Sequence, residues 1–118
     1  MKGPSMKLRN MSATVSTGET ITLKLRNGET ITLENATVLT SYASRVAVYS
    51  KMQLFLLPCY DYSVTTWKHL HAFIDEYCAG VRDCSAREMR YNAENELHGG
   101  EYRFADGIVL ASGYVERY

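Results

Sequence analysis

The hexapeptide GETITL occurs twice, at residues 18–23 and 28–33, and this doubling constrains the fold more than any other feature of the chain. In both copies isoleucine and leucine alternate with threonine, which is the period-two pattern of a strand with one apolar face. The repeat could be two copies of a binding motif or the two arms of one hairpin. The spacing between the copies decides between these alternatives, because it sets the register of the pairing.

A two-residue turn between the copies would set Leu25 opposite Thr30, so apolar and polar side chains would share one face of the sheet. A three-residue loop at 26–28 instead sets Leu23 opposite Ile31 and keeps the apolar side chains of both arms together. We therefore predict one hairpin with this loop, in which the repeat belongs to the scaffold.

The period-two pattern runs from residue 14 to residue 57 and is rich in β-branched residues, leucine and tyrosine. It predicts consecutive strands near 20–25, 29–34, 36–41, 45–50 and 53–57. Gly18 is assigned to a bend before the first of them. The residues from Leu54 to Leu57 are apolar at every position, so we expect this strand to be central, with a helix or another cover on its second face.

The stretch that follows Pro58 changes to a helical period. Its apolar face is formed by Trp67, Leu70, Phe73, Ile74, Tyr77 and Cys78. The opposite face carries Lys68, His71, Asp75 and Glu76. Gly80 is suited to cap the C-terminal end, whereas three residues compete for the N-cap without a preference between them: Ser63, Thr65 and Thr66.

Farther along, Ser85 and Glu88 form a capping box that begins a second helix, which Gly99-Gly100 ends. The remaining residues predict a hairpin around Asp106-Gly107 and a last strand. The predicted fold class is therefore α+β: an antiparallel sheet, made of an N-terminal β-meander and a C-terminal hairpin, packed with two helices.

The length of 118 residues suits one domain. Gly3-Pro4-Ser5 ahead of Met6 is typical of a cloning remnant, so we assign residues 1–11 to a tag remnant and disordered start, and residues 12–118 to a single α+β domain. No apolar run approaches the roughly 20 residues that a bilayer span needs, so no membrane span is predicted.

Thirteen basic residues balance thirteen acidic ones, so no long-range field attracts the chain to nucleic acid, and a nucleic-acid partner is disfavoured. The three cysteines are odd in number and lack a C-x-x-C spacing. They predict neither a disulfide framework nor a zinc site, and they indicate a reducing, cytoplasmic setting.

The densest group of polar side chains surrounds the predicted helix start. Its candidate binding residues are Tyr60, Asp61, Tyr62, Thr65, Thr66, Lys68 and His69. Free backbone N–H groups at a helix start favour an anion, so a nucleotide or another phosphate compound could bind there. Serine and threonine in such places more often only cap the helix, and we give that role the greater weight.

His69 and His71 lie two positions apart on the predicted helix and so point about 200° apart, which prevents them from sharing one metal ion. The sequence contains no recognisable nucleophile with a histidine base held by a third group, and no glycine-rich phosphate loop. We therefore predict no catalytic residue, no metal and no cofactor, and a protein that is not an enzyme.

Tyrosine is the compositional outlier, with nine residues. Tyrosine and arginine are enriched in protein interfaces, and Tyr42 lies close to Arg45 in the sequence, which makes both candidates for partner binding. Tyrosine also suits half-buried strands. Interface and sheet packing therefore stay equal alternatives, and a homodimer through an exposed edge strand stays open.

The segments ENATVLTSYASRVAVYSK and YDYSVTTWKHLHAFI resemble a family of small uncharacterised proteins encoded by bacteriophages and other mobile elements of Firmicutes. The shared pattern is S-Y-x-x-x-V-A followed by Y-S-x-T-T-x-[KR]-H. Its positions in this chain are Ser41, Tyr42, Val46, Ala47, Tyr62, Ser63, Thr65, Thr66, Lys68 and His69. The resemblance covers residues 20–74 and implies a genomic setting more than a mechanism.

By analogy with other small phage-encoded proteins, we expect a non-enzymatic binding module in the host cytoplasm. Small phage-encoded domains without catalytic motifs often bind a host protein, and inhibitors of bacterial defence, including anti-CRISPR proteins, have this size and composition. We therefore expect a module that inhibits a host defence protein through protein–protein contact. The alternative is a small-ligand binding protein that holds a nucleotide or phosphate compound at the Thr65–His69 helix start.

Overall fold

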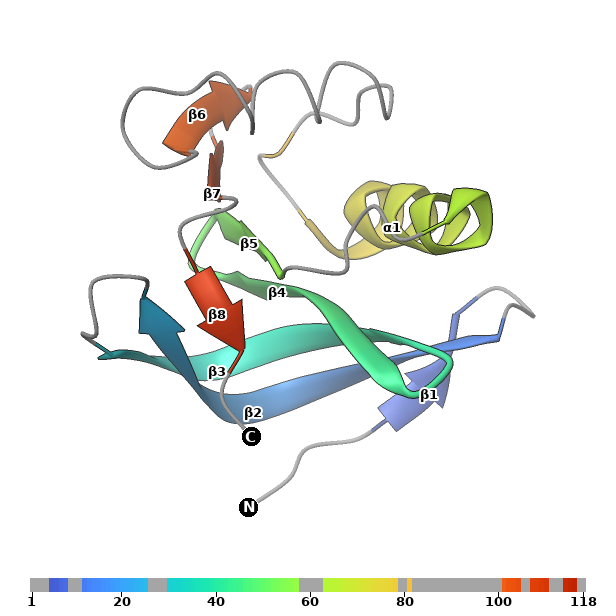
Figure 1. Cartoon of the computed structure of the whole chain (residues 1–118), viewed down its shortest axis with the longest axis horizontal. Coiled ribbons are helices and arrows are strands. Elements are labelled where there is room, and N and C mark those ends of the chain that lie inside the picture. The colour runs from blue at the N-terminus through green and yellow to red at the C-terminus, as the bar shows by residue number, and fades with distance from the viewer. Residues whose placement is uncertain are drawn as a thin grey trace.

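The structure is a computed structural model that describes residues 5–8, 12–25, 30–57, 63–78, 81, 101–104, 107–110 and 114–116. The elements along the chain are β1 (Ser5–Lys7), β2 (Ala13–Leu25), β3 (Thr30–Ser41), β4 (Ser44–Ser50), β5 (Gln53–Leu56), α1 (Val64–Tyr77), β6 (Glu101–Phe104), β7 (Gly107–Leu110) and β8 (Tyr114–Glu116). The strands form one sheet in the order β1-β2-β3-β4-β5-β7-β6, and β8 also pairs with β2 (Figure 1).

The predicted α+β class is confirmed, with an antiparallel meander from β1 to β5 and, among the described residues, the single helix α1. The C-terminal hairpin of β6 and β7 is also present, but β7 pairs with β5 in parallel, which the sequence did not indicate. β3 pairs along one edge of β2. The other edge of β2 is shared by two short strands: β1 pairs near the start of β2, and β8 pairs near the end of β2. The predicted second helix, from Ser85 to Gly99, lies outside the described residues.

The register of the doubled GETITL is confirmed. Leu23 pairs with Ile31 and Ile21 pairs with Leu33, as the three-residue loop requires. The loop itself lies outside the described residues. On the other face of this hairpin, the hydroxyls of Thr22 and Thr32 lie 3.3 Å apart. The two copies are therefore two arms of one hairpin.

The strand boundaries on either side of this hairpin were predicted wrongly. β2 begins at Ala13 and passes through Gly18, which has φ of 66° and lies within the strand instead of at a bend. The separate strands predicted at 29–34 and 36–41 are one strand, β3, which passes through Asn35 with φ of 51°. The register shifts by one residue on each strand in turn, so the two shifts cancel and the pairing continues.

The predicted disordered start also needs correction at Ser5–Leu8. Ser5–Lys7 pairs with β2, and Leu8 is buried in the core with its N–H donating to the Ala13 carbonyl at 3.0 Å. Backbone hydrogen bonds to β2 and burial of one leucine are the physical reason why this segment belongs to the sheet.

The sheet carries a hydrophobic cluster on each face. The cluster beneath α1 includes Val15, Leu39, Leu54, Leu56, Trp67, Leu70, Phe73 and Ile74. The other cluster includes Ile21, Leu23, Val38, Val48, Phe55 and Leu57. Alternate residues of the segment 54–57 enter opposite clusters, which confirms that this strand is covered on both faces. In Figure 1, α1 lies against one side of the strands, and β8 lies near β2.

The β4–β5 turn carries backbone strain. Lys51 and Met52 form a two-residue turn between Ser50 and Gln53, with φ of 50° and 64°. Two-residue turns with positive φ at both positions favour Asn-Gly. The double change Lys51→Asn and Met52→Gly should therefore raise the free energy of unfolding by about 1 kcal/mol, because left-handed φ costs residues with a Cβ about 1–2 kcal/mol each. Chemical denaturation measures this gain, and unchanged or lower stability would count against it.

Candidate functional site

Tyr42 is the most exposed aromatic side chain that the structure describes, and it lies in a strained turn. The β3–β4 connection contains only Tyr42 and Ala43, because Ser41 pairs directly with Ser44. Tyr42 has φ of 54° and its side chain is 67% exposed. Glycine is the residue best suited to a positive φ, so a large aromatic residue at this position is unusual. We call residues 41–44 the Tyr42 turn.

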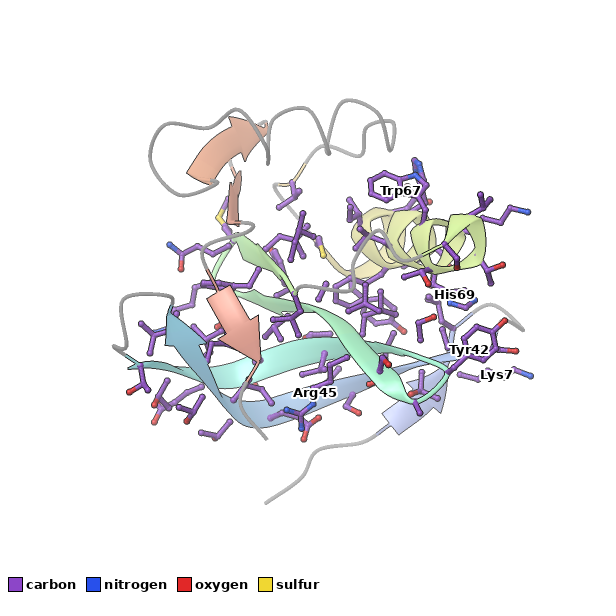
Figure 2. The ribbon with its side chains drawn as sticks, in the orientation of Figure 1. Lys7, Tyr42, Arg45, Trp67 and His69 are labelled. Carbon is purple, nitrogen blue, oxygen red and sulfur yellow. The ribbon has the colours of Figure 1, made fainter. Side chains whose placement is uncertain are left out.

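The helix α1 contacts the Tyr42 turn through His69, which lies between the helix and Tyr42 in Figure 2. The rings of Tyr42 and His69 have centroids 5.8 Å apart and are tilted by 55°. His69 Nδ1 lies 2.7 Å from Ser41 Oγ, a hydrogen bond between two buried side chains. The Tyr42 N–H donates to the Ser12 carbonyl at 2.9 Å. One backbone hydrogen bond and one ring contact therefore connect Tyr42 to Ser12 and to α1.

The Ser41–His69 pair has the spacing of a nucleophile and its base, but its burial does not suit catalysis. Ser41 is 4% exposed and His69 is 3% exposed. A nucleophile has to reach a substrate, whereas this hydroxyl is covered. The pair instead fastens α1 to the sheet. Burial also raises the pKa of the Cys78 thiol, so this cysteine stays protonated and packs as a small apolar side chain.

Ser63 is the N-cap of α1, which decides the choice that the sequence left open. Its Oγ accepts a hydrogen bond from the Thr66 N–H at 3.1 Å, and its carbonyl accepts one from the Trp67 N–H at 3.0 Å. The Thr66 hydroxyl lies 3.1 Å from Ser63 Oγ and is buried. Thr66 therefore stabilises the helix start from inside, as the capping role predicts.

The predicted site residues differ in their exposure to solvent. Tyr42, Thr65 and Lys68 are exposed. Thr66 and His69 are buried, and Arg45 is half-buried in β4 opposite Thr40. Tyr60, Asp61 and Tyr62 lie outside the described residues. Tyr42 and His69 are brought into contact, whereas Thr66 belongs to the helix cap.

The role of Ser41 was missed by sequence reasoning. Ser41 belongs to the S-Y-x-x-x-V-A pattern, but its hydrogen-bond partner, His69, lies 28 residues away. No periodic pattern connects a turn serine to a histidine on a later helix. Only the packing of α1 on the sheet brings these two residues together.

The two histidines of α1 contact different groups. His69 faces the Tyr42 turn, whereas the His71 ring meets Trp67 edge-on with centroids 5.1 Å apart. Within the described ranges, no group of three or more His, Cys, Asp or Glu side chains could hold a metal ion. No helix in the described part of the chain is long and apolar enough to cross a membrane.

The burial of His69 predicts a loss of stability below neutral pH. Burial lowers the pKa of the His69 imidazole from its ordinary value of 6.5, because a charged ring is poorly solvated there. As the pH falls, His69 is therefore protonated at a higher pH in the unfolded chain than in the folded protein. Neutral His69 contributes fully to the free energy of unfolding above pH 6.5, the ordinary pKa of the imidazole. This contribution is lost as the pH falls from 6.5 toward the lower pKa of His69 in the folded protein. Denaturation midpoints measured across this window should fall more steeply for the wild type than for His69→Gln.

Comparison with known proteins identifies a family but no activity. The segment 6–93 matches the model of a family of unknown function, DUF8033. This match contains β2 to β5 and α1, and with them the Tyr42 turn and His69. No curated protein and no solved structure matches the chain.

Proposed function

The chain belongs to DUF8033, a family of unknown function, and we propose that it is a non-enzymatic module that binds a partner protein through the Tyr42 turn. The observation that carries the proposal is an exposed tyrosine side chain on a residue with a positive backbone φ. The Tyr42 ring contacts His69, and the Tyr42 N–H donates a hydrogen bond to the Ser12 carbonyl. Tyrosine is a frequent hot-spot residue, because it buries a large area on binding and loses little conformational entropy.

The strain at Tyr42 supports this proposal. A left-handed residue with a side chain costs the fold about 1–2 kcal/mol, and such strain concentrates at functional sites. The other tyrosines with described side chains, Tyr49 and Tyr77, pack against the core. Their role is sheet and helix packing, whereas Tyr42 contributes far less of its ring to the core. We propose that packing accounts for Tyr49 and Tyr77, whereas partner binding accounts for Tyr42.

A phosphate ligand at the helix start has less support. Ser63 already accepts the Thr66 N–H, and the Thr66 and His69 side chains are buried in contacts of the fold. Thr65 and Lys68 remain exposed and could reach an anion. This alternative predicts a thermal shift with nucleotides that Lys68→Ala abolishes, and no shift across a nucleotide panel would exclude it.

The resemblance to phage and mobile-element proteins supports a cellular setting for the partner. In that setting the partner is a host protein of the cytoplasm, and a component of bacterial defence is the first candidate, as for an anti-CRISPR protein. Recovery of a defence component from a host lysate would support this assignment, and recovery of unrelated proteins alone would contradict it.

The proposal is tested by partner capture with paired variants. Wild-type protein should retain a host protein that Tyr42→Ala does not retain. Met52→Ala is the matched control, because Met52 is 43% exposed and also has a positive φ, but lies at the far end of β4. This separation is roughly 20 Å along the strand. Equal capture by wild type and Tyr42→Ala would overturn the proposal.

A further inference from the structure

His69 lies buried at the contact between α1 and the Tyr42 turn. Its side chain is 3% exposed. Its Nδ1 lies 2.7 Å from Ser41 Oγ, and its ring centroid lies 5.8 Å from that of Tyr42. Figure 2 shows the imidazole between the helix and Tyr42. A titratable group therefore occupies the contact between the helix and the turn that we propose for binding.

The surroundings of His69 suit a neutral imidazole better than a charged one. A neutral ring has one N–H donor, which can lie on Nδ1 toward Ser41, whereas an imidazolium has two donors and needs an acceptor for each. In the described part of the chain, the ring forms a hydrogen bond through Nδ1 and none through Nε2. Protonation in place would therefore leave a buried N–H without an acceptor, in addition to the cost of burying the charge.

No carboxylate among the described residues compensates a charge on His69. From the sheet and the turn, the ring meets the hydroxyl of Ser41 and the phenol of Tyr42. On α1, the adjacent charged residue is the exposed Lys68, whose charge has the same sign as an imidazolium. The acidic residues of this helix are in its last turn. Burial is accordingly the cause that lowers the pKa of the imidazole.

The charged residues of the neighbouring strands point away from α1. Lys7 pairs with Thr14, and Thr14 pairs with Thr40. Thr40 in turn pairs with Arg45. Directly opposed residues point to the same side of a sheet, and the next residues along β2 and β3 belong to the cluster beneath α1. This row of four therefore lies on the other face, and neither of its cations meets His69.

The Tyr42 turn is the part of this contact that can move at the lowest cost. Tyr42 has φ of 54°, which is unfavourable for a residue with a Cβ. One backbone hydrogen bond, from the Tyr42 N–H to the Ser12 carbonyl, connects it to the segment before β2. On the other side of the contact, Leu70 and Phe73 of α1 are fully buried in the core. Exposed segments with few buried contacts open before such buried ones.

We infer that His69 makes the Tyr42 turn pH-sensitive: when its imidazole is protonated, the turn separates from α1 while the strands and the helix stay folded. The charged ring then reaches water, and the strain at Tyr42 is relieved. Neutral His69 keeps the turn in contact above pH 6.5, and the contact is lost as the pH falls from 6.5 toward the lower pKa of the folded protein. The release itself needs no partner. Its consequence, loss of the partner in acid, rests on the proposed function.

Hydrogen exchange of the full ¹⁵N-labelled chain tests the release at individual amides. The Tyr42 N–H reports on the turn through its bond to the Ser12 carbonyl. The Leu57 N–H donates to the Val46 carbonyl at 2.9 Å and reports on the sheet. Between about pH 7 and about pH 5, the protection factor of Tyr42 relative to that of Leu57 should fall on the order of ten-fold. One proton sets a limit of about ten-fold per pH unit.

Two variants of the buried pair should respond in opposite directions. In His69→Asn, the side-chain amide can hydrogen-bond to Ser41 Oγ but gains no proton in this range, so the relative protection of Tyr42 should not change with pH. Ser41→Ala keeps the imidazole and removes its hydrogen bond. The release should then begin at a higher pH than in the wild type, because less holds the turn against α1. A general loss of fold would not produce these opposite changes.

Three results would overturn the inference: relative protection of Tyr42 that is constant with pH in the wild type, equal loss of protection at Tyr42 and Leu57, or wild-type pH dependence in His69→Asn. Exchange needs no partner, so this test stands whether or not partner capture succeeds. A captured partner that needs Tyr42 and is retained equally at both pH values would overturn the regulation and leave the proposed function intact.

Discussion

Tyr42→Gly should weaken partner binding on the order of 30-fold or more, while its fold should be more stable than that of Tyr42→Ala. Both changes remove the ring, and truncation of a hot-spot tyrosine costs about 2 kcal/mol or more, on the order of 30-fold in affinity. Glycine also relieves the positive φ of 54°. Relief of this strain should stabilise the folded state by about 1–2 kcal/mol. The greater conformational freedom of glycine in the unfolded chain should offset about 0.5–1 kcal/mol of that gain.

Ala43→Gly is the control for this prediction. Ala43 lies in the same turn without a positive φ, so glycine there should reduce stability and leave binding intact. Denaturation and partner capture give the two readouts for all three variants. If Tyr42→Gly retained the partner, or if it were less stable than Tyr42→Ala, the strained turn would not be a site whose geometry is maintained for binding.

Phe73→Ala should produce the largest loss of stability. Phe73 is fully buried between α1 and the sheet, and its ring stacks on Tyr77 with centroids 5.7 Å apart. Removing a buried phenylalanine typically costs about 3–5 kcal/mol, from lost burial and from the cavity that remains. That is a large part of the about 5–15 kcal/mol that stabilises a domain. We expect the melting temperature to fall on the order of 10–20 °C.

Val64→Ala is the matched control on the same helix. Val64 is 76% exposed, so its truncation should change stability by less than about 0.5 kcal/mol. Because α1 supports the Tyr42 turn through His69, Phe73→Ala should also weaken partner capture, without any change in the exposed surface. A Phe73→Ala protein with the wild-type melting temperature would show that α1 does not pack on the sheet as described.

Local patterns predicted those parts of the fold that depend on neighbours in sequence. The register of the GETITL hairpin followed from alternation alone, because a slip by one residue would turn its leucines to the other face. The buried face of α1 followed from its period of 3.6 residues. The N-cap was narrowed to three candidates, and the hydrogen bond from the Thr66 N–H selects Ser63.

The predicted strand boundaries were wrong where a glycine or an asparagine was taken to end a strand. Gly18 and Asn35 both adopt a positive φ within a continuous ladder, so each is a bulge instead of a turn. The parallel pairing of β5 with β7 could not be predicted from the sequence either. It joins segments that are separated by α1, and no local pattern records which edge of a sheet a later strand will meet.

The sequence by itself determined the hairpin, the apolar faces of the strands and helix, and the prominence of Tyr42 and His69 as candidates. Only the tertiary structure assigned them different roles, with the tyrosine exposed and the histidine buried beneath it. Burial is a property of packed surfaces, and the Ser41–His69 hydrogen bond joins residues 28 positions apart. The surface that we propose for binding therefore exists only once α1 has packed against the Tyr42 turn.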